Sequence, residues 1–347
     1  MNPQRQQLYD ELAARIGNTP LIPYTGDFPN NNHLFLKREC DNPFGSHYDR
    51  VYLELFREFE EYRGLQPGAK VLETTSGTAG TAFAGIGKLL GYECHIAIAG
   101  GVDAAIVNII QEQGVTIYRT AERDYINGFP DFLREFLPLH PDFYFLNHSM
   151  GKRAGAGFSN NEITLNAFGT IAREIMQEID IDIYMPAVGN GSTVLGPARV
   201  FTAQTKIITF ESVQAAVMYD QKYPSRYEDR FGIKPGTLPR HRLRGTSYQG
   251  IDFPHIRHTV EADLITGAML VSDRWQDYYY AQATGRDDFK ALPHWDQTFA
   301  GYEDLGRSTR AGIACAIELA KSVENQNIVI LAYDKADRYD SEAVIPY

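Results

Sequence analysis

The sequence is poor in cysteine, in cationic residues and in long apolar runs. Its three cysteines, Cys40, Cys94 and Cys315, lie far apart with no Cys-x-x-Cys spacing. Such a sparse, odd set excludes a disulfide framework and predicts reduced thiols in a cytoplasmic protein. No segment approaches the roughly 18 consecutive apolar residues of a membrane helix. The net charge of −11 argues against nucleic-acid and membrane partners, because both select a basic face.

The rest of the composition is ordinary for a globular protein. The 347 residues are 44% hydrophobic and 22% charged, which predicts a large core and two subdomains. The segment Met1–Ile16 is polar and helix-like and lacks the apolar core of a signal peptide. No internal repeat or low-complexity tract occurs.

Short apolar, strand-like runs alternate with helical patterns. This alternation predicts an α/β fold with parallel sheets covered by helices on both faces. The predicted strands are 70–73, 94–99, 115–118, 143–146, 182–187, 206–210 and 328–332, and the predicted helices are 79–90, 103–113, 170–178 and 311–322. Residues 213–306 have poor periodicity and are interpreted as loops and short helices over a pocket.

One stretch carries a specific signature. Residues 37–50 read KRECDNPFGSHYDR. This stretch resembles the K-x-E-x-x-N-P-x-G-S-x-K-D-R signature of the fold-type II pyridoxal-phosphate enzymes, the group of cysteine synthase, cystathionine β-synthase and the serine/threonine dehydratases. Every anchor letter matches except the lysine that forms the Schiff base, where this chain has Tyr48.

A phenol cannot replace that lysine as a nucleophile. Only a primary amine condenses with the cofactor aldehyde and passes it to a substrate amino group. The chain has ten lysines, of which Lys37 and Lys152 are the candidates for a relocated Schiff base. Tyr48 could instead carry a proton if its pKa fell from its usual value of about 10.

Two further motifs resemble elements of the family, and the second of them is expected to bind a substrate carboxylate. Residues 16–21, IGNTPL, resemble the opening of many family members. Residues 73–80, ETTSGTAG, follow a predicted strand and resemble the family's substrate loop, E-x-T-S-G-N-T-G. The resemblance assigns Thr75, Ser76 and Gly77 to the α-carboxylate of an amino acid, which a helix N-terminus favours. The alternative is a simple helix cap.

The resemblance also implies residues that hold the cofactor. The family's ring-contacting asparagine is Thr78 here, followed by Ala79, so two groups that grip the pyridoxal ring have changed. Ser308, in the stretch 306–314, would face the pyridine nitrogen, but Arg310 stands where glycine is usual. The predicted phosphate-binding loop is Gly189, Asn190, Gly191, Ser192 and Thr193, whose glycines and hydroxyls suit a phosphate.

The remaining motifs are interpreted as structural. Residues 167–175 resemble an element of the dehydratase branch, and residues 332–339 resemble the family's C-terminal DSGERY. His255 and His258 have helical spacing without further metal ligands, so they are expected on the surface, and no metal site is predicted. The run 278–280 of three tyrosines is expected to pack rather than to bind a cofactor. His47, beside Tyr48, is a candidate for stacking on the cofactor.

The resemblance spans residues 16–339 and implies two subdomains, each a mostly parallel twisted sheet with helices on both faces, as in the β subunit of tryptophan synthase. The small, mobile subdomain is expected at 45–149, and the large one, with the phosphate loop, at 1–44 and 150–347. A homodimer acting on a small amino-acid-type substrate is the family-level expectation.

Three functional hypotheses remain open at this point. The first is an enzyme acting on an amino acid or a derivative without an internal aldimine, either without pyridoxal phosphate or with that cofactor bound noncovalently. The second is a noncatalytic protein that binds a phosphorylated ligand or an amino acid in a regulatory role. The third is that Tyr48 is an introduced substitution in an ordinary enzyme.

Overall fold

The computed structural model describes residues 2–149, 160–247, 249–250 and 252–340. The chain divides into two compact units. Unit 1 consists of Met1–Thr19, Glu39–Phe168 and Asp337–Asp340, and the described part of unit 2 consists of Pro20–Arg38 and Gly169–Ala336. Lys152, one candidate for a relocated Schiff base, lies outside the described residues.

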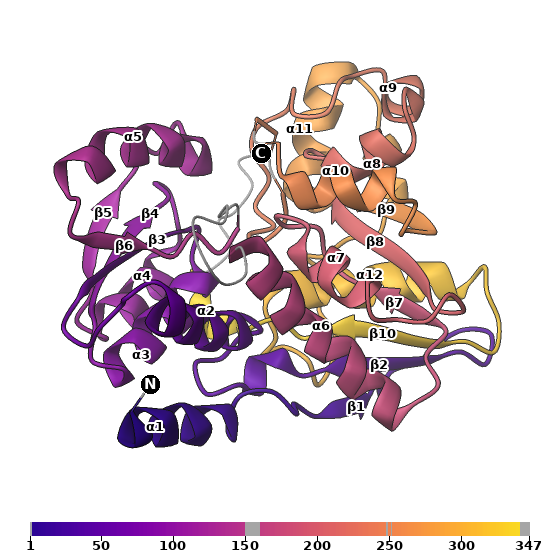
Figure 1. The fold of residues 1–347 in the computed structure, drawn as a ribbon. Coiled ribbons are helices and arrows are strands. Elements are labelled where there is room, and N and C mark those ends of the chain that lie inside the picture. Colours follow the sequence, from indigo (N-terminus) through magenta and orange to yellow (C-terminus); the bar gives the residue numbers. More distant parts are fainter. Residues whose placement is uncertain (1, 150–159, 248, 251, 341–347) are drawn as a thin grey trace. The chain divides into compact units, whose positions relative to one another are not determined.

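Unit 1 is built on a four-stranded parallel sheet (Figure 1). The strand order is β5 (Thr116–Arg119), β4 (Glu93–Ile98), β3 (Lys70–Thr75) and β6 (Phe143–Phe145). The central strand β3 is buried from its second residue to its last, as expected for a parallel strand covered on both faces. Its carboxyl end leads directly into a helix, which is where ligands bind in such folds.

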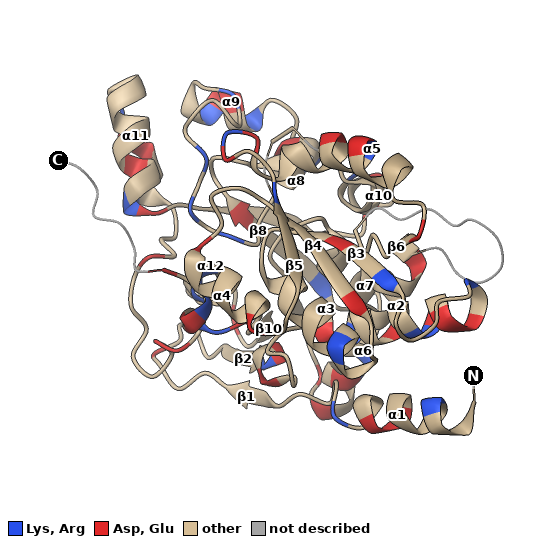
Figure 2. Cartoon of the chain, turned by 90° about the vertical axis from the view of Figure 1, so that its left-hand side faces the viewer, with Lys and Arg blue, Asp and Glu red and all other residues tan. Residues whose placement is uncertain are grey.

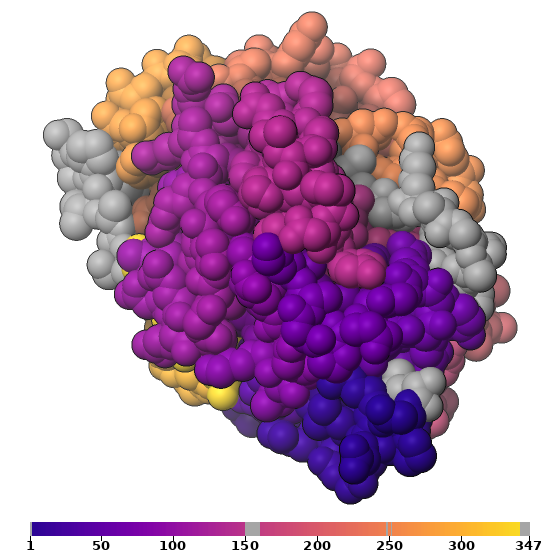
Figure 3. Space-filling model, turned by 60° about the vertical axis from the view of Figure 1, so that its left-hand side comes forward, coloured from indigo at the N-terminus to yellow at the C-terminus, as the bar shows by residue number. Residues whose placement is uncertain are grey.

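Helices surround this sheet and connect its strands. The elements of unit 1 are α1 (Pro3–Ala13), η1 (Glu39–Asp41), α2 (Tyr48–Tyr62), α3 (Thr78–Leu89), α4 (Ala104–Gln111), η2 (Tyr125–Gly128) and α5 (Phe129–Leu139). Helix α6 (Asn160–Glu178) begins in unit 1 and ends in unit 2. Helix α1 is tied to α2 by an ion pair of Arg5 with Glu60, and Figure 3 shows its indigo atoms lying against purple atoms of the same unit.

Unit 2 contains a six-stranded sheet in which one edge strand is antiparallel. The order is β1 (Leu21–Pro23), β2 (His33–Lys37), β10 (Asn327–Leu331), β7 (Ile183–Met185), β8 (Lys206–Ser212) and β9 (Gly267–Val271). Only the β1–β2 pairing is antiparallel. The helical elements are α7 (Ser192–Ala198), α8 (Val217–Lys222), α9 (Arg226–Phe231), α10 (Pro254–Glu261), α11 (Arg274–Thr284), η3 (Asp288–Ala291), α12 (Arg307–Ala320) and η4 (Ala336–Arg338), whose last two residues belong to unit 1.

The predicted fold class is confirmed: both sheets are mostly parallel and flanked by helices (Figure 1). All seven predicted strands are present with shifted ends. Unit 1 contains the whole expected small subdomain, 45–149, and also residues 1–19 and 39–44, which the sequence placed in the large one. The physical reason is the attachment of these segments to α2. The subdomain boundaries themselves stay a prediction.

Residues 213–306 are more regular than their sequence suggested. They contain strand β9 and the 11-residue helix α11, and a buried cluster of their own apolar residues holds them together. In that cluster Tyr280 stacks on Phe289 with ring centroids 3.8 Å apart, so the last of the three consecutive tyrosines is a packing residue. His255 is buried rather than on the surface, because it faces inward from α10, whereas His258 is exposed.

The described surface carries charges of both signs. Figure 2 shows Lys and Arg interspersed with Asp and Glu on both units. Within the described ranges, no helix combines the length and the apolar character needed to cross a bilayer.

Candidate active site

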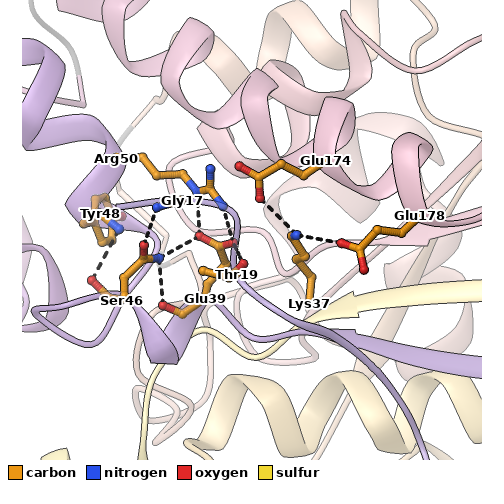
Figure 4. Close-up of polar contacts among 10 residues, drawn as sticks. Gly17, Thr19, Lys37, Glu39, Ser46, Tyr48, Arg50, Glu174 and Glu178 are labelled. Atoms are coloured by element: carbon orange, nitrogen blue, oxygen red, sulfur yellow. Dashed lines mark hydrogen bonds and ion pairs between the residues drawn. The ribbon is translucent and has the colours of Figure 1, made fainter. Parts of the chain in front are cut away.

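The signature residues form a buried polar network in unit 1 (Figure 4). The Arg50 guanidinium donates to both oxygens of Glu39 at 2.8 Å, and both side chains are almost fully buried. The Thr19 hydroxyl donates to Glu39 at 2.7 Å. The Asn42 amide donates to Glu39 at 3.1 Å and its oxygen accepts from the backbone N–H of Gly17 at 2.8 Å. This network joins the segment 16–21 to the signature.

The loop before Tyr48 is fixed from a second side. Gly45 has a φ of 77°, a conformation that favours glycine. A Cβ there would meet Arg338, whose guanidinium donates to the Phe44 carbonyl at 2.7 Å and to the Thr81 hydroxyl at 2.9 Å. The C-terminal motif thus anchors the signature loop, in agreement with the structural role expected for it.

Lys37 is committed to an ion-pair cluster in unit 2. Its ammonium lies 3.0 Å from Glu174 and 3.3 Å from Glu178, both on α6 (Figure 4). Lys37 is the buried lysine among those that the structure describes. Removing it from two carboxylates would leave charge uncompensated. These contacts argue against Lys37 as a relocated Schiff base.

Tyr48 is the first residue of α2 and lies in an aromatic cluster of unit 1. Its ring centroid is 4.2 Å from that of His47, 5.3 Å from His148 and 5.8 Å from Phe168. Tyr52, one helical turn further, lies 6.5 Å away. The Tyr48 side chain remains partly exposed, whereas His47 and Tyr52 are buried.

The environment of Tyr48 favours the neutral phenol. Burial, and secondarily the nearby carboxylate of Glu73, raise the pKa of Tyr48 above its ordinary value of 10.0. The hypothesis of a phenol with a lowered pKa is therefore not supported by its surroundings. A neutral phenol at this position is a hydrogen-bond donor rather than a base.

His47 stacks on protein rings. It lies 5.2 Å from Phe168 in a stacked arrangement and is also in contact with Tyr48. These ring contacts are part of the packing within unit 1. Its role beside a cofactor stays a prediction.

The predicted substrate loop lies where the sequence placed it, between β3 and α3. The Gly77 N–H donates to the Thr75 hydroxyl at 2.9 Å, and the φ of Gly77 is 141°. A Cβ on Gly77 would meet Ile106 at 3.0 Å, so this turn requires glycine. Ser76 and Thr78 are partly exposed, whereas Thr75 is buried. The partly exposed Ser76 hydroxyl thus lies directly before the first turn of α3.

Thr78 begins α3 and differs from the family's asparagine as the sequence indicated. Its carbonyl accepts from the Thr81 hydroxyl at 2.9 Å, which in turn binds Arg338. Ala79 is buried in the first turn. The contact of Thr78 with a pyridoxal ring stays a prediction.

Three residues that the sequence analysis did not assign lie next to Tyr48 and this loop. Glu73, His148 and Tyr52 form a buried, hydrogen-bonded cluster in unit 1. Tyr52 follows Tyr48 by one helical turn, and His148 follows strand β6. Because they come from a strand, a helix and a loop, no local sequence pattern could have grouped them.

In unit 2 the predicted phosphate loop joins β7 to α7. The Asn190 side-chain oxygen accepts from the Ser192 N–H at 2.9 Å and from the Ser192 hydroxyl at 2.6 Å. The Thr193 hydroxyl donates to the Ala187 carbonyl at 3.3 Å. The donors expected to bind phosphate are therefore paired inside the loop.

The glycines of this loop face protein. A Cβ on Gly189 would lie 2.8 Å from the Gly245 carbonyl, and a Cβ on Gly191 would lie 2.9 Å from the backbone nitrogen of Ile256. Ser308, at the start of α12, donates to the Arg244 carbonyl at 3.0 Å. The segment around Gly245 thus lies against both Gly189 and Ser308, whereas Gly191 lies against the start of α10.

Arg310 packs against a buried tryptophan near Ser308. Its guanidinium lies 5.6 Å from the Trp295 ring centroid, and that of Arg307 lies 5.8 Å from the same ring. Such contacts stabilise a guanidinium over an aromatic face. The charged side chain expected near Ser308 is present and is held by Trp295.

Among the residues that the structure describes, neither position 48 nor Lys37 offers an unpaired amine for a link to pyridoxal phosphate. Position 48 carries a phenol, and Lys37 is bound to two glutamates. The hydroxyls of Ser192 and Ser308 already donate within the protein. A phosphate could take the Ser192 donors only by displacing the Asn190 side chain.

Two parallel α/β units with a glycine-rich loop in each define the class of fold-type II pyridoxal-phosphate proteins. Residues 12–263 match the family described as "Pyridoxal-phosphate dependent enzyme". The chain belongs to this family. Its Tyr48 stands at the position where the family signature has the Schiff-base lysine.

Curated relatives are similar over nearly the whole chain. A putative mitochondrial cysteine synthase of Saccharomyces cerevisiae is 25% identical, with 98% of this chain and 84% of that protein covered. A cysteine synthase of Aquifex aeolicus is 25% identical, with 96% of this chain and 92% of that protein covered. The chain is therefore cysteine-synthase-like in sequence.

Solved structures share the fold. An O-acetylserine-dependent cystathionine β-synthase from Helicobacter pylori matches with a TM-score of 0.73 and 21% identity, covering 96% of this chain and 97% of that one. A hydrogen-sulfide-producing enzyme from Fusobacterium nucleatum matches with a TM-score of 0.73 and 18% identity, covering 94% of this chain and 98% of that one. At these identities the likeness concerns the fold.

Replacing Arg50 by methionine should destabilise the protein by about 3–5 kcal/mol, because Glu39 would keep a buried charge without its partner. The measurement is the free energy of unfolding in urea. Arg57→Met is the matched control on the same helix, since the Arg57–Glu54 pair is partly exposed and should cost at most about 1 kcal/mol. Equal losses in the two variants would contradict the importance of the buried pair.

The buried carboxyl group of Asp49 should make the free energy of unfolding decrease as pH rises. Burial raises its pKa from 3.8 to about 7, although the Phe44 N–H donates to it at 2.6 Å. The folded state then binds more protons than the unfolded state between these values, so the free energy of unfolding decreases as pH increases through this window. Relative to wild type, Asp49→Asn should gain about 2–3 kcal/mol between pH 5 and 8. Urea unfolding at several pH values measures this difference, and a constant difference would contradict it.

Proposed function

We propose that this protein is a cysteine-synthase-like enzyme of altered mechanism. It acts on an amino acid or an amino-acid-derived substrate, with its family's elimination and replacement chemistry as ancestry, and uses no lysine-linked aldimine. The feature that supports the proposal is a tyrosine at position 48, at the start of α2, in the same unit as the loop that resembles the family's carboxylate-binding loop. Any pyridoxal phosphate that takes part is bound noncovalently.

The loop supports an amino-acid substrate. In our proposal the α-carboxylate is bound by Thr75, Ser76 and Gly77. The 12-residue helix α3 begins directly after them, and its positive end favours an anion. Thr75 is held by its bond with the Gly77 N–H, so the partly exposed Ser76 hydroxyl is the side-chain donor of the loop.

Tyr48 has a donor's role in this proposal. Its raised pKa keeps the proton on the phenol, so the hydroxyl can donate to a developing negative charge on the substrate. His47 positions the Tyr48 ring through the close contact of the two side chains.

A noncatalytic binding protein is the second candidate. The hydroxyls of Ser192 and Ser308 donate within the protein, which favours a chain that no longer uses its family's cofactor for turnover. In this case the pocket would hold an amino acid or a phosphorylated ligand in a regulatory role. Turnover of an amino acid separates this candidate from the enzyme.

We further propose a cytoplasmic homodimer. The three cysteines are free and buried, and burial raises the pKa of Cys94 to about 12, which keeps this thiol protonated and unreactive. Thiols of this kind suit a reducing compartment. The dimer is carried over from the family.

Restoring the amine at position 48 should restore covalent binding of the cofactor. After incubation with pyridoxal phosphate, Tyr48→Lys should develop the visible band of a protonated Schiff base, whereas wild type should not. Borohydride reduction followed by mass spectrometry should then show the cofactor on the peptide that contains position 48. Tyr48→Arg is the matched control, because a guanidinium has the same charge and forms no such bond.

Labelling of any lysine in the wild-type protein would refute the loss of the aldimine. No labelling in Tyr48→Lys would show that the pocket has lost its fit for pyridoxal phosphate and would favour chemistry without that cofactor.

Removing the phenol hydroxyl distinguishes the two candidate functions. Tyr48→Phe should lower turnover of the amino-acid substrate about 100-fold or more, because a donor to developing charge is lost while the ring packing remains. Steady-state kinetics measures the effect, and amino-acid affinity should change little. An unchanged rate would contradict a catalytic role for Tyr48.

A further inference from the structure

A buried histidine in unit 1 is held by two polar side chains at one ring nitrogen. His148 Nδ1 lies 3.0 Å from the Tyr52 hydroxyl and 3.2 Å from Glu73 Oε2. Glu73 and Tyr52 are fully buried, and His148 is 5% exposed. These contacts fix the plane of the imidazole.

The backbone of His148 is fixed as well. Its N–H donates to Glu73 Oε2 at 3.2 Å, and its carbonyl accepts from the Thr164 hydroxyl at 2.8 Å. The other Glu73 oxygen accepts from the Thr74 N–H at 2.8 Å. A residue held through both its backbone and its side chain is preorganised rather than mobile.

The carboxylate determines which ring nitrogen carries the proton. We assign the proton of the neutral ring to Nδ1, because an ionised carboxylate only accepts hydrogen bonds and Glu73 lies 3.2 Å from this nitrogen; the Tyr52 hydroxyl is then its second acceptor. The lone pair is then on Nε2. This is the arrangement by which a carboxylate orients a histidine base in hydrolytic triads.

This cluster is joined to the proposed substrate loop and to Tyr48. Glu73 and Thr75 belong to the same strand, β3, which ends at the loop. The Tyr48 ring meets the His148 ring edge-on, with centroids 5.3 Å apart and an interplanar angle of 84°. His148 thus contacts Tyr48 directly and is connected to the loop through Glu73, which lies two residues before Thr75 on β3.

We propose that His148 is the base that takes a proton from the amino acid bound at Thr75, Ser76 and Gly77, with Glu73 as its positioning residue. The inference rests on the proposed function. In the step, a proton of the substrate's α-ammonium moves to Nε2, and the electron pair of the broken N–H bond stays on nitrogen. The products are a free α-amine and an imidazolium that faces Glu73.

In this assignment Tyr48, Glu73 and His148 each have one role. Tyr48, as a neutral phenol, donates a hydrogen bond. Glu73 orients the histidine and stabilises its charged form. His148 supplies the basic nitrogen that the family obtains from its lysine, without the covalent link that only an amine provides.

Another histidine in the same unit provides a contrast. His95, on β4, is buried like His148 and also contacts a tyrosine and a glutamate, at 3.2 Å from the Tyr118 hydroxyl and 3.0 Å from Glu93 Oε1. There the two contacts fall on different ring nitrogens, Nδ1 and Nε2. Both ring nitrogens of His95 therefore contact a polar side chain, and neither is left to act as a base. We assign this cluster a packing role.

The test is nitrogen-15 NMR of the histidine rings in the full-length protein. We expect His148 to have its proton on Nδ1, and to become protonated on Nε2 when an amino acid binds. The probes are each of the standard amino acids and O-acetyl-L-serine, with binding measured by calorimetry. The resonance is assigned by its loss in His148→Gln, or by its shift in Tyr52→Phe if the first variant does not fold.

The possible outcomes separate the two proposals. If an amino acid binds and the His148 ring does not change, or if its proton is on Nε2 beforehand, the inference is wrong while the proposed function stands. If none of the probes binds, the proposed function fails and the inference fails with it.

Kinetics gives a second measurement of the same role. His148→Gln should reduce turnover of the amino-acid substrate about 100-fold or more, because a general base usually contributes this much to the rate. Glu73→Gln should move the acidic limb of the pH–rate profile to lower pH, because the imidazolium loses its carboxylate. His95→Gln, the matched control, should leave both rate and profile unchanged. A similar loss in His95→Gln would show a structural effect and would overturn the inference.

Discussion

The buried ion pair between Glu39 and Arg50 is the constraint on which the signature segment depends. The buried Glu39 carboxylate and the buried Arg50 guanidinium neutralise each other. Thr19 and Asn42 complete the hydrogen bonds of the carboxylate. Two charges buried together are tolerated only with such geometry. The start of α2, and with it the position of Tyr48, follows from this network. The chemistry of position 48 does not enter it.

The site in unit 1 is organised as two layers. Residues of the signature form a polar foundation, and aromatic rings lie over it around Tyr48. The foundation contains charge in fixed pairs, whereas burial among the rings, together with the Glu73 carboxylate, raises the pKa of Tyr48. In unit 2, by comparison, the glycine-rich loop is closed on itself through Asn190, and a backbone segment packs against its glycines.

Much of this organisation could be predicted from the sequence. The strands and the positions of both glycine-rich loops follow from short apolar runs ending at Gly, Ser and Thr. Strand β9 and helix α11 could not be predicted, because their residues are buried against partners distant in sequence, such as Tyr280 of α11 against Phe231. The cluster of Glu73, Tyr52 and His148 was missed for the same reason: its members come from a strand, a helix and a loop, and no local spacing unites them. The raised pKa of Tyr48 depends on burial, which a sequence pattern does not measure.

The separation between the polar network and position 48 has an evolutionary consequence. Because Glu39, Asn42 and Arg50 hold the segment without help from the side chain at position 48, that side chain can be exchanged while the scaffold stays folded. The residue at position 48 is thus open to replacement on a framework that other residues hold in place. In this motif the residues that match the family signature hold the fold, and the residue that differs, Tyr48, bears on the chemistry.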